Sequence, residues 1–401
     1  MSGGPSWFTE EHVLNILSEY ETFPKLVKLN SWSLKPATSK GENFASSLNV
    51  LESKYILSDG SEKSSSFIVK CRLENEMMDA IESDFNVFER ETQVYRVIIK
   101  EMEGILRSIE DYTELAPKAI YLDDKMIVLE NLKNRGYSIG DVKVGLGKEQ
   151  ISMICEKLAK FHACSMVLYD KFADMFKNHL SANMSENENP LHIFYKNAID
   201  TCIQFCESKP GLQKYSSKLK EFHPKVISKL IDVFSRNEKD RYHVLNHGDC
   251  WVNNFMFKDK TENVIFIDFQ EGYYGSPGID LNYLFCSSLT KDTYIQHKNE
   301  LIIEYQNTLS DILRKLHYSK YIPSVEDVHF EILNKGFHGL ATVTATLPIL
   351  MNMNPEVADP MNFILDTDDA KANRIKVFNN PRYEGILEVF LKEYVEHNIL
   401  I

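Results

Sequence analysis

The spacing of apolar residues divides the chain into a strand-rich first part and a helix-rich remainder. In the first 130 residues, apolar positions recur at helical spacing over 9–20 and 83–109, which predicts two helices. Thr9 can cap the first of them. Strand-like runs bounded by turn residues predict four strands, at residues 46–58, 64–73, 118–122 and 125–130.

Beyond a glycine-punctuated stretch at 134–147 the pattern becomes helical. Residues 149–169 have an apolar face at helical spacing, and mostly helical sequence continues to about residue 240. A compact strand-rich piece interrupts it at 242–269, and helical sequence follows to the end. We therefore predict a mixed α+β fold with two lobes. The parts would be an N-terminal lobe at 1–130, a linker at 131–148 and a helical C-terminal lobe at 149–401.

Composition and charge narrow the possible classes of function. The 401 residues include 43% apolar and 26% charged side chains, as in ordinary globular proteins. The formal net charge of −13 argues against a nucleic-acid partner, which needs a basic face. No obligate protein partner is evident from the sequence.

Cysteine usage and the absence of targeting features bear on localisation. Seven scattered cysteines without C-x-x-C spacing indicate reduced thiols rather than a disulfide framework. The N-terminal stretch MSGGPSWFTEE lacks the features of a secretory signal. The longest weakly polar run, residues 339–351, is too short to span a bilayer. The sequence therefore predicts a cytoplasmic protein without a membrane segment.

The strongest chemical signal lies in the segment HVLNHGDCWVNNFMFKDKTENVIFIDFQEGYYGSPGIDLNYLF. Asp249 and Asn254 lie in a polar loop between two short apolar strands, and Asp268 ends the second strand. Protein kinases carry H-R-D-x-x-x-x-N followed by D-F-G, and here the same skeleton reads HGD, Asn and DFQ. A lone H-G-D or a single strand-end Asp is common by chance, but their joint occurrence at this spacing is rare.

Phosphoryl transfer accounts for each of these three residue types. It requires an oriented hydroxyl nucleophile and metal ions that bridge the phosphates. We predict that Asp249 is the catalytic base or orienter of the acceptor hydroxyl. Asn254 and Asp268 complete the catalytic set, and their oxygens are suitable ligands for Mg²⁺. The cofactors expected are therefore ATP and Mg²⁺.

The first half of the chain offers an independent check. A kinase needs a strand Lys for the phosphates of ATP and a helix Glu that holds it. Lys70 follows the apolar run Phe67-Ile68-Val69, and Glu91 lies beside the apolar stripe of the next helix. Glu89 is an alternative partner on a different face. A surface Lys and a solvated Glu would be the ordinary interpretation of each residue alone, but the downstream motif favours a functional pair.

Two further segments are candidates for nucleotide binding. Residues 41–47 lie where a phosphate loop is expected, and small or polar residues there could let backbone amides approach phosphates. The candidates in this loop are Gly41, Asn43, Ala45 and Ser46. Only one glycine is present, so the motif alone is weak. Glu130 and Leu132 end the last predicted strand before the linker, where a kinase hinge presents backbone groups to adenine.

Two features favour a small-molecule acceptor over a protein acceptor. The short interval between Asp268 and Asp280 contains no A-P-E motif and leaves no room for a long activation segment. Gly248 also replaces the Arg that receives an activation-loop phosphate in protein kinases. We therefore predict a small-molecule hydroxyl acceptor.

The motifs HGDCWVNNFMF, VIFIDFQ and YGSPGIDLNYLF resemble the ecdysteroid kinase-like (CHK kinase-like) family, which is related to choline and aminoglycoside kinases. The stretches GENFASSL, FERETQVYR, IVLENL and LAKFHA match the same pattern in order, so the resemblance covers roughly residues 30–340. It implies a bilobal protein kinase-like fold, with a strand-rich N-lobe and a helical C-lobe. It also implies ATP with Mg²⁺ and phosphorylation of a hydroxyl on an ecdysteroid or another lipophilic molecule. Asp280 would brace the catalytic loop.

The acceptor is expected to bind in the C-terminal lobe. Trp251, Tyr273, Tyr274 and residues 337–350 are candidate walls, although they could equally be core residues. His162 is expected to be a core histidine. Two alternatives remain open: a choline- or aminoglycoside-type kinase for a cationic molecule, and a nucleotide-binding protein without catalytic activity.

Overall fold

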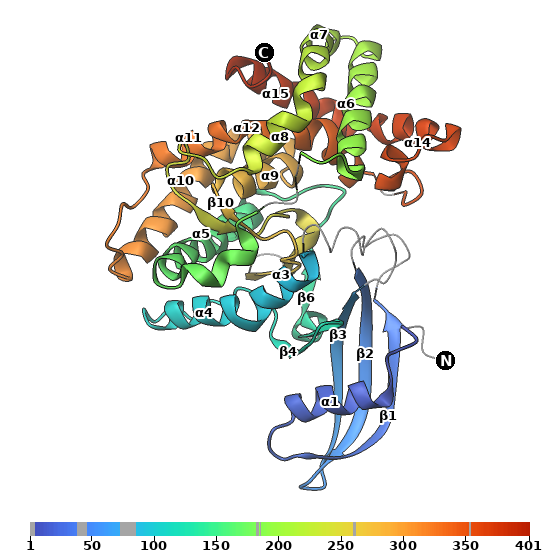
Figure 1. Cartoon of the computed structure of the whole chain (residues 1–401), viewed down its shortest axis with the longest axis vertical. Coiled ribbons are helices and arrows are strands. Elements are labelled where there is room, and N and C mark those ends of the chain that lie inside the picture. The colour runs from blue at the N-terminus through green and yellow to red at the C-terminus, as the bar shows by residue number, and fades with distance from the viewer. Residues whose placement is uncertain are drawn as a thin grey trace.

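The computed structural model describes residues 5–37, 46–72, 86–181, 184, 186–259, 262–352 and 354–401. A strand-rich N-terminal lobe and a larger helical lobe meet at helices α3 and α4, which lie between the sheet and α5 (Figure 1). The predicted mixed α+β architecture, with a strand-rich first lobe and a helical second lobe, is confirmed. The elements of the first lobe are α1 (Glu10–Tyr20), β1 (Leu26–Pro36), β2 (Ser46–Leu57), β3 (Glu62–Arg72), α3 (Val87–Gln93), the π-helical turn η1 (Val94–Ile98), α4 (Ile99–Arg107), β4 (Ala119–Leu122) and β5 (Met126–Glu130).

The N-terminal sheet is antiparallel, in the order β1-β2-β3-β5-β4. Its core alternates with the strand period: Leu51, Phe67 and Val69 point inward and pack against the apolar face of α1, which buries Val13, Ile16 and Leu17. The two helices and four strands predicted from the pattern are present. Residues 83–85 of the second predicted helix lie outside the described residues.

Strand β1 was not predicted. It is an edge strand in which only Leu34 is fully buried, and most of its other side chains are exposed. A sheet edge with one lightly covered face imposes little hydrophobic alternation. The sequence signal for this strand was correspondingly weak.

The second lobe is built mainly from helices around one large core. Its helices are α5 (Lys148–Lys171), η3 (Ala173–His179), α6 (Pro190–Ser208), α7 (Gln213–Phe222), η4 (His223–Lys225), α8 (Val226–Phe234), α9 (Gly278–Ser287), α10 (Lys291–Lys315), α11 (Val325–Asn334), α12 (Gly336–Ala341), η6 (Thr342–Thr346), α13 (Leu347–Leu350), η7 (Pro360–Phe363), α14 (Asp368–Phe378) and α15 (Pro381–Glu396). Helices α5 and α10 run parallel and pack side by side at its centre, where Lys148 pairs with Glu300 and Ser152 with Glu304.

Short strands within this lobe carry the loop that was singled out in the sequence. They are β6 (Tyr137–Ile139), β7 (Val244–Asn246), β8 (Phe255–Lys258), β9 (Asn263–Phe266) and β10 (Tyr273–Gly275), with the 3₁₀ turns η2 (Leu132–Arg135) and η5 (Val252–Asn254). They form a β6-β8-β9 sheet and a β10-β7 pair. Strand β10 was not predicted, and β6 falls inside the range taken as a linker.

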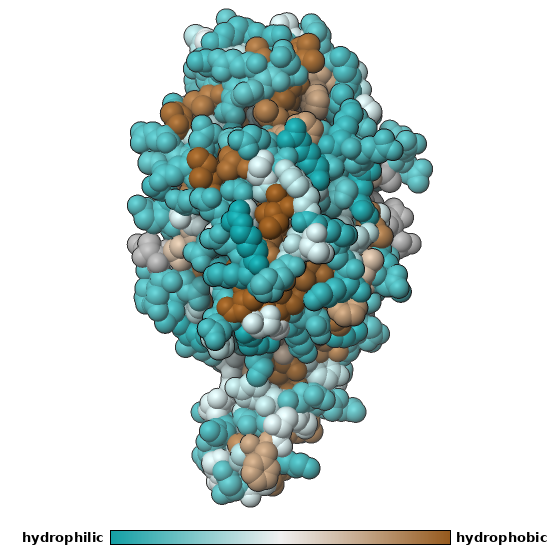
Figure 2. All heavy atoms as spheres, turned by 90° about the vertical axis from the view of Figure 1, so that its left-hand side faces the viewer, coloured by the Kyte–Doolittle hydropathy of each residue, from teal (hydrophilic) through white to brown (hydrophobic). Residues whose placement is uncertain are grey.

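The surface and the cysteines agree with a globular protein. Hydrophilic side chains cover most of the face seen in Figure 2, and apolar ones gather there only in small separate patches. Among the described residues, no helix is both long and apolar enough to cross a bilayer. All seven cysteines are unbridged and buried, so the prediction of free thiols is confirmed.

Candidate active site

Asp280 organises the loop between β7 and β8. Its Oδ2 accepts a hydrogen bond from the backbone N–H of His247 at 2.7 Å, and its Oδ1 accepts one from Gly248 at 2.8 Å. His162 Nε2 lies 3.1 Å from Asp280 Oδ2, and its Nδ1 lies 2.7 Å from the hydroxyl of Tyr305. Burial opposes ionisation of Asp280, but these hydrogen bonds hold its pKa below the ordinary value. Asp280 and His162 therefore brace the loop from inside the core.

Position 248 in this loop has no room for a side chain. Its φ of +86° lies in the left-handed region, and a Cβ there would stand 2.1 Å from the carbonyl oxygen of Glu271. Only glycine tolerates both conditions. The segment after Asp268 turns back at once, and Tyr273 of β10 pairs with Asn246 of β7. No long excursion separates Asp268 from Asp280.

Asp249 is half-buried in this loop. Its Oδ2 accepts hydrogen bonds from Asn254 Nδ2 at 2.8 Å and from Trp251 Nε1 at 3.2 Å. Burial, followed by the negative charges of Asp268 and Glu271, raises the pKa of Asp249 to about 7. A carboxylate with a pKa in this range is well matched to accepting a proton near neutral pH.

Asn254 and Asp268 fit the role of metal ligands. Asn254 directs Nδ2 at the backbone oxygen of Asp249 at 2.9 Å and at its carboxylate, which turns Oδ1 away from these partners. Asp268 uses Oδ1 for an ion pair with Lys70. It has a left-handed φ of 66°, so the backbone leaves the strand conformation at this residue, and its carboxylate is partly exposed. Amide and carboxylate oxygens of this kind are the ligands that Mg²⁺ takes from proteins.

Lys70 joins the two lobes through two ion pairs. Its Nζ lies 2.5 Å from Glu91 Oε2 on α3 and 2.7 Å from Asp268 Oδ1 after β9. Lys70 and Glu91 are almost fully buried, with side-chain exposures of 6% and 1%. Burial alone would lower the pKa of Lys70, but Asp268 and Glu91 raise it above its ordinary value. The structure thus pairs Lys70 with Glu91 and not with Glu89, which is exposed.

Aromatic contacts fix the helix that carries Glu91 against the strand end that carries Asp268. The ring of Phe269 is buried and meets Tyr95 edge-on at 5.5 Å between centroids. It also lies 5.8 Å from the ring of Phe161 on α5 and 4.7 Å from His247. Sequence analysis did not single out Tyr95 or Phe161, because nothing in the local pattern distinguishes them from other core aromatics.

The structure describes only some of the remaining residues predicted to bind the nucleotide. Gly41, Asn43 and Ala45 lie outside the described residues, whereas Ser46 is buried at the start of β2. Glu130 ends β5, and its carboxylate accepts from Lys118 N and pairs with Arg135. Leu132 is buried in the η2 turn that follows. Any contact of this hinge with adenine would therefore come from backbone groups, and it remains a prediction.

Of the candidate acceptor residues, Trp251 lies beside Asp249, whereas others are buried in the core. Trp251 contacts Asp249, whereas Tyr273 and Tyr274 are buried, and Tyr274 stacks on Tyr169 at 4.0 Å. Within 337–350, His338 is buried and stacks on Tyr283 at 5.5 Å.

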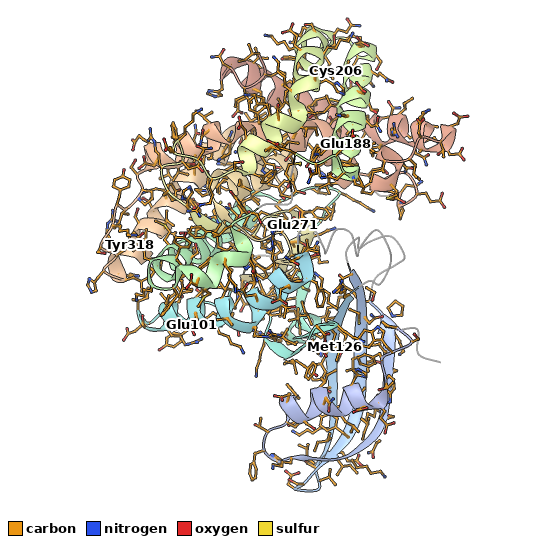
Figure 3. All side chains as sticks on the ribbon, viewed as in Figure 1. Glu101, Met126, Glu188, Cys206, Glu271 and Tyr318 are labelled. Atoms are coloured by element: carbon orange, nitrogen blue, oxygen red, sulfur yellow. The ribbon has the colours of Figure 1, made fainter. Side chains whose placement is uncertain are left out.

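Three further residues around the candidate base were missed by sequence analysis. Glu271 and Tyr283 lie near Asp249, and Tyr195 lies near Tyr283. Tyr283 contributes a hydrogen bond that lowers the pKa of Asp249, against the larger effect of burial. Figure 3 shows Glu271 close to where the two lobes meet. No sequence motif marks these side chains, since two of them come from the distant helices α6 and α9.

Removal of the Asp280 carboxylate tests how far the loop depends on it. We expect Asp280→Ala to lower the free energy of unfolding by about 3 kcal/mol, because two backbone N–H groups and His162 lose a buried acceptor. Urea denaturation monitored by tryptophan fluorescence would measure the change. Asp311→Ala, at a side chain that is 66% exposed, is the matched control and should change little. Equal stability of the two variants would contradict the bracing role.

Comparisons with known proteins identify a family and several similar solved structures. Residues 40–318 match the ecdysteroid kinase-like family. No curated protein matches the sequence significantly. Among solved structures, a macrolide 2'-phosphotransferase type I shares 11% identity, covers 92% of this chain and 100% of its own, and has a TM-score of 0.41. An ethanolamine kinase from Plasmodium vivax shares 12% identity over 89% of this chain and 85% of its own, with a TM-score of 0.40.

A glucosamine kinase in complex with glucosamine, ADP and inorganic phosphate is also similar, with 12% identity, coverage of 98% and 99%, and a TM-score of 0.32. The family match covers residues 40–318. That match spans more than half of the sequence, and the chain belongs to the ecdysteroid kinase-like family.

Proposed function

We propose that this protein is an ATP- and Mg²⁺-dependent kinase that phosphorylates a hydroxyl group of a lipophilic small molecule. The observation that carries the proposal is the double ion pair of Lys70. It ties Glu91 of the N-terminal lobe to Asp268 of the C-terminal lobe at 2.5 and 2.7 Å. This is the arrangement that a kinase needs for ordered phosphates and metal. The unbridged cysteines support a cytoplasmic setting.

Each polar residue of the site would then have one task. Bound ATP with Mg²⁺ would supply the phosphoryl group and the cationic charge that stabilises it in transfer. Lys70 would hold phosphate oxygens, and Asn254 and Asp268 would hold the metal. Asp249 would accept the proton of the acceptor hydroxyl, and its hydrogen bonds from Asn254 and Trp251 keep the carboxylate oriented.

The surroundings of Asp249 support a lipophilic acceptor. Trp251 and Tyr283 are partly exposed aromatic residues near this carboxylate, and the partly exposed Tyr195 lies near Tyr283. Aromatic side chains contribute large apolar contact areas in ligand sites. An ecdysteroid is the acceptor that the family's description suggests, and other steroids or phenols present the same chemistry.

A second acceptor class is favoured by the charge of the same region. Glu271 lies near enough to Asp249 for its negative charge to raise the pKa of Asp249. Two carboxylates beside aromatic rings also suit an amino alcohol with a cationic nitrogen. The third possibility, a protein without catalytic activity, is disfavoured because Lys70, Asp249, Asn254 and Asp268 all have competent side chains in a connected arrangement.

An acceptor panel tests the proposal directly. Incubation with ATP and Mg²⁺ and a set of ecdysteroids, other steroids, phenols and amino alcohols should add one phosphate to a neutral lipophilic alcohol, detected by mass spectrometry. Preference for amino alcohols over their neutral analogues would support the second class. Omission of Mg²⁺ should abolish the product. No phosphorylated product from any acceptor, with ATP bound, would contradict the proposed function.

A further inference from the structure

The helix that carries Glu91 is held from its other side by a segment outside the catalytic motifs. Residues 173–181, which follow α5 and include η3, lie against α3; we name them the η3 bridge. The Nε2 of Gln93 donates to the backbone oxygen of Met175 at 2.7 Å, and Asn178 Nδ2 donates to Gln93 Oε1 at 3.2 Å. Gln93 therefore uses both ends of its amide on this segment.

A second contact lies one helical turn earlier. Arg90 Nη2 donates to the backbone oxygen of Ser181 at 2.7 Å and lies 3.3 Å from its hydroxyl. Arg90 and Gln93 are three residues apart, so they share a face of the helix. Glu91 lies about 100° round from Arg90. The η3 bridge thus holds the face beside the one that presents Glu91 to Lys70.

The same bridge also holds the segment that follows Asp268. His179 is fully buried, and its Nδ1 donates to the backbone oxygen of Gly272 at 3.1 Å. Burial lowers the pKa of His179 to about 4, so its ring is neutral at physiological pH. Phe176 packs on Tyr274 of β10 at 5.2 Å between ring centroids. Both elements that supply partners of Lys70 are therefore attached to one short segment.

We propose that the η3 bridge is a built-in clamp that positions α3, with Gln93 as its principal positioning residue for the Glu91–Lys70 ion pair. In protein kinases the equivalent helix is set by an activation segment that is itself controlled by phosphorylation. The short interval after Asp268 leaves no such segment here, and the η3 bridge takes its place. The helix is then held in position without a phosphorylation step. This inference rests on the proposed use of ATP by Lys70.

Loss of the clamp should affect ATP more than the acceptor. Gln93→Met keeps the length of the side chain and the helix propensity but removes both hydrogen bonds. We expect the KM for ATP to rise about tenfold, since two partly buried hydrogen bonds together contribute on the order of a factor of ten. The KM for the acceptor should change less than twofold. Asn178→Ala removes one of the two bonds and should give a smaller increase.

A readout that does not depend on activity separates this inference from the proposed function. Amide hydrogen exchange over residues 87–98 should become faster in Gln93→Met without any nucleotide. Gln296→Met, at an exposed position on α10, is the matched control and should leave exchange and KM unchanged. Unchanged exchange in Gln93→Met, or an unchanged KM for ATP in an active protein, would overturn the clamp. Failure of the wild-type protein to use ATP while exchange still accelerates would overturn only the proposed function.

Discussion

Replacement of Asp249 by Asn is expected to lower kcat by about a thousandfold, the range typical of a lost general base. Asn cannot accept the proton of the acceptor hydroxyl, but it can still accept the hydrogen bonds that Asn254 and Trp251 donate at this position. ATP affinity should therefore change little, because Lys70 and Asp268 are untouched. Steady-state kinetics with separately varied ATP and acceptor would measure both quantities. Full activity of the variant would show that Asp249 is not the base.

The pH profile provides a finer test of the same residue. With a pKa of about 7, Asp249 must lose its proton before it can act, so kcat/KM should rise with pH through an acidic limb near neutrality. Glu271→Gln removes one of the negative charges that raise this pKa, so the limb should move to lower pH. A limb that stays in place in this variant would mean that the pH dependence comes from another group.

The raised pKa also has a consequence for stability. The unfolded Asp has a pKa near 3.9, so the folded state binds a proton more tightly, and the ionised carboxylate opposes folding above about pH 7. That cost disappears as the pH falls toward 4. Asp249→Asn removes it, and we expect the inactive variant to be more stable than the wild-type protein by about 1 kcal/mol at pH 8 and no more stable at pH 4. Urea denaturation at the two pH values would measure the difference.

The candidate catalytic loop could be singled out from the sequence because its information is local. Asp249, Asn254 and Asp268 stand at spacings set by one loop and one strand, so the sequence alone can indicate them. Glu91 was preferred over Glu89 because it lies beside the apolar stripe, and the ion pair with Lys70 agrees with that choice. A polar residue on a helix or strand that packs on the core can be located relative to the regularly spaced apolar residues of that helix or strand.

The residues that sequence analysis missed depend on contacts between distant segments. Glu271 and Tyr283 approach Asp249 only because β10 pairs with β7 and α9 packs beneath the loop. Gln93 looks like an ordinary polar helix residue, and its partners, the backbone oxygen of Met175 and the side chain of Asn178, lie more than 80 residues further along the chain. Strand β10 was not predicted because a strand of three residues is too short to show an alternating pattern.

Replacement of Lys70 by Met is expected to have the largest combined effect on stability and activity. The change leaves Glu91, which is 1% exposed, and Asp268 close together without their shared cation. Removal of one partner from a buried ion pair costs about 3 kcal/mol or more, because a charge remains without compensation. The variant should also fail to bind ATP. Lys54→Met, at an exposed position on β2, is the control that should preserve both properties.

The destabilisation of Lys70→Met should depend on pH in a defined direction. Burial raises the pKa of Glu91 to about 7 even with Lys70 present; the charge of Asp268 adds to this effect and Lys70 opposes it. Loss of the lysine should raise the pKa of Glu91 further. A carboxyl group with a raised pKa in the folded state destabilises when it is ionised and ceases to do so as it gains its proton. The variant should therefore be much less stable than the wild-type protein at pH 8 and approach it at pH 5.

A second substitution separates the two roles of Lys70. Glu91→Gln in the Lys70→Met background removes the uncompensated charge, and we expect it to recover most of the lost stability at pH 8. ATP binding should stay absent, because no cation then faces the phosphates. Thermal denaturation and titration with a fluorescent ATP analogue would measure the two effects. Persistent instability of the double variant would show that the ion pair is not the cause, and retained ATP binding would show that Lys70 does not hold the nucleotide.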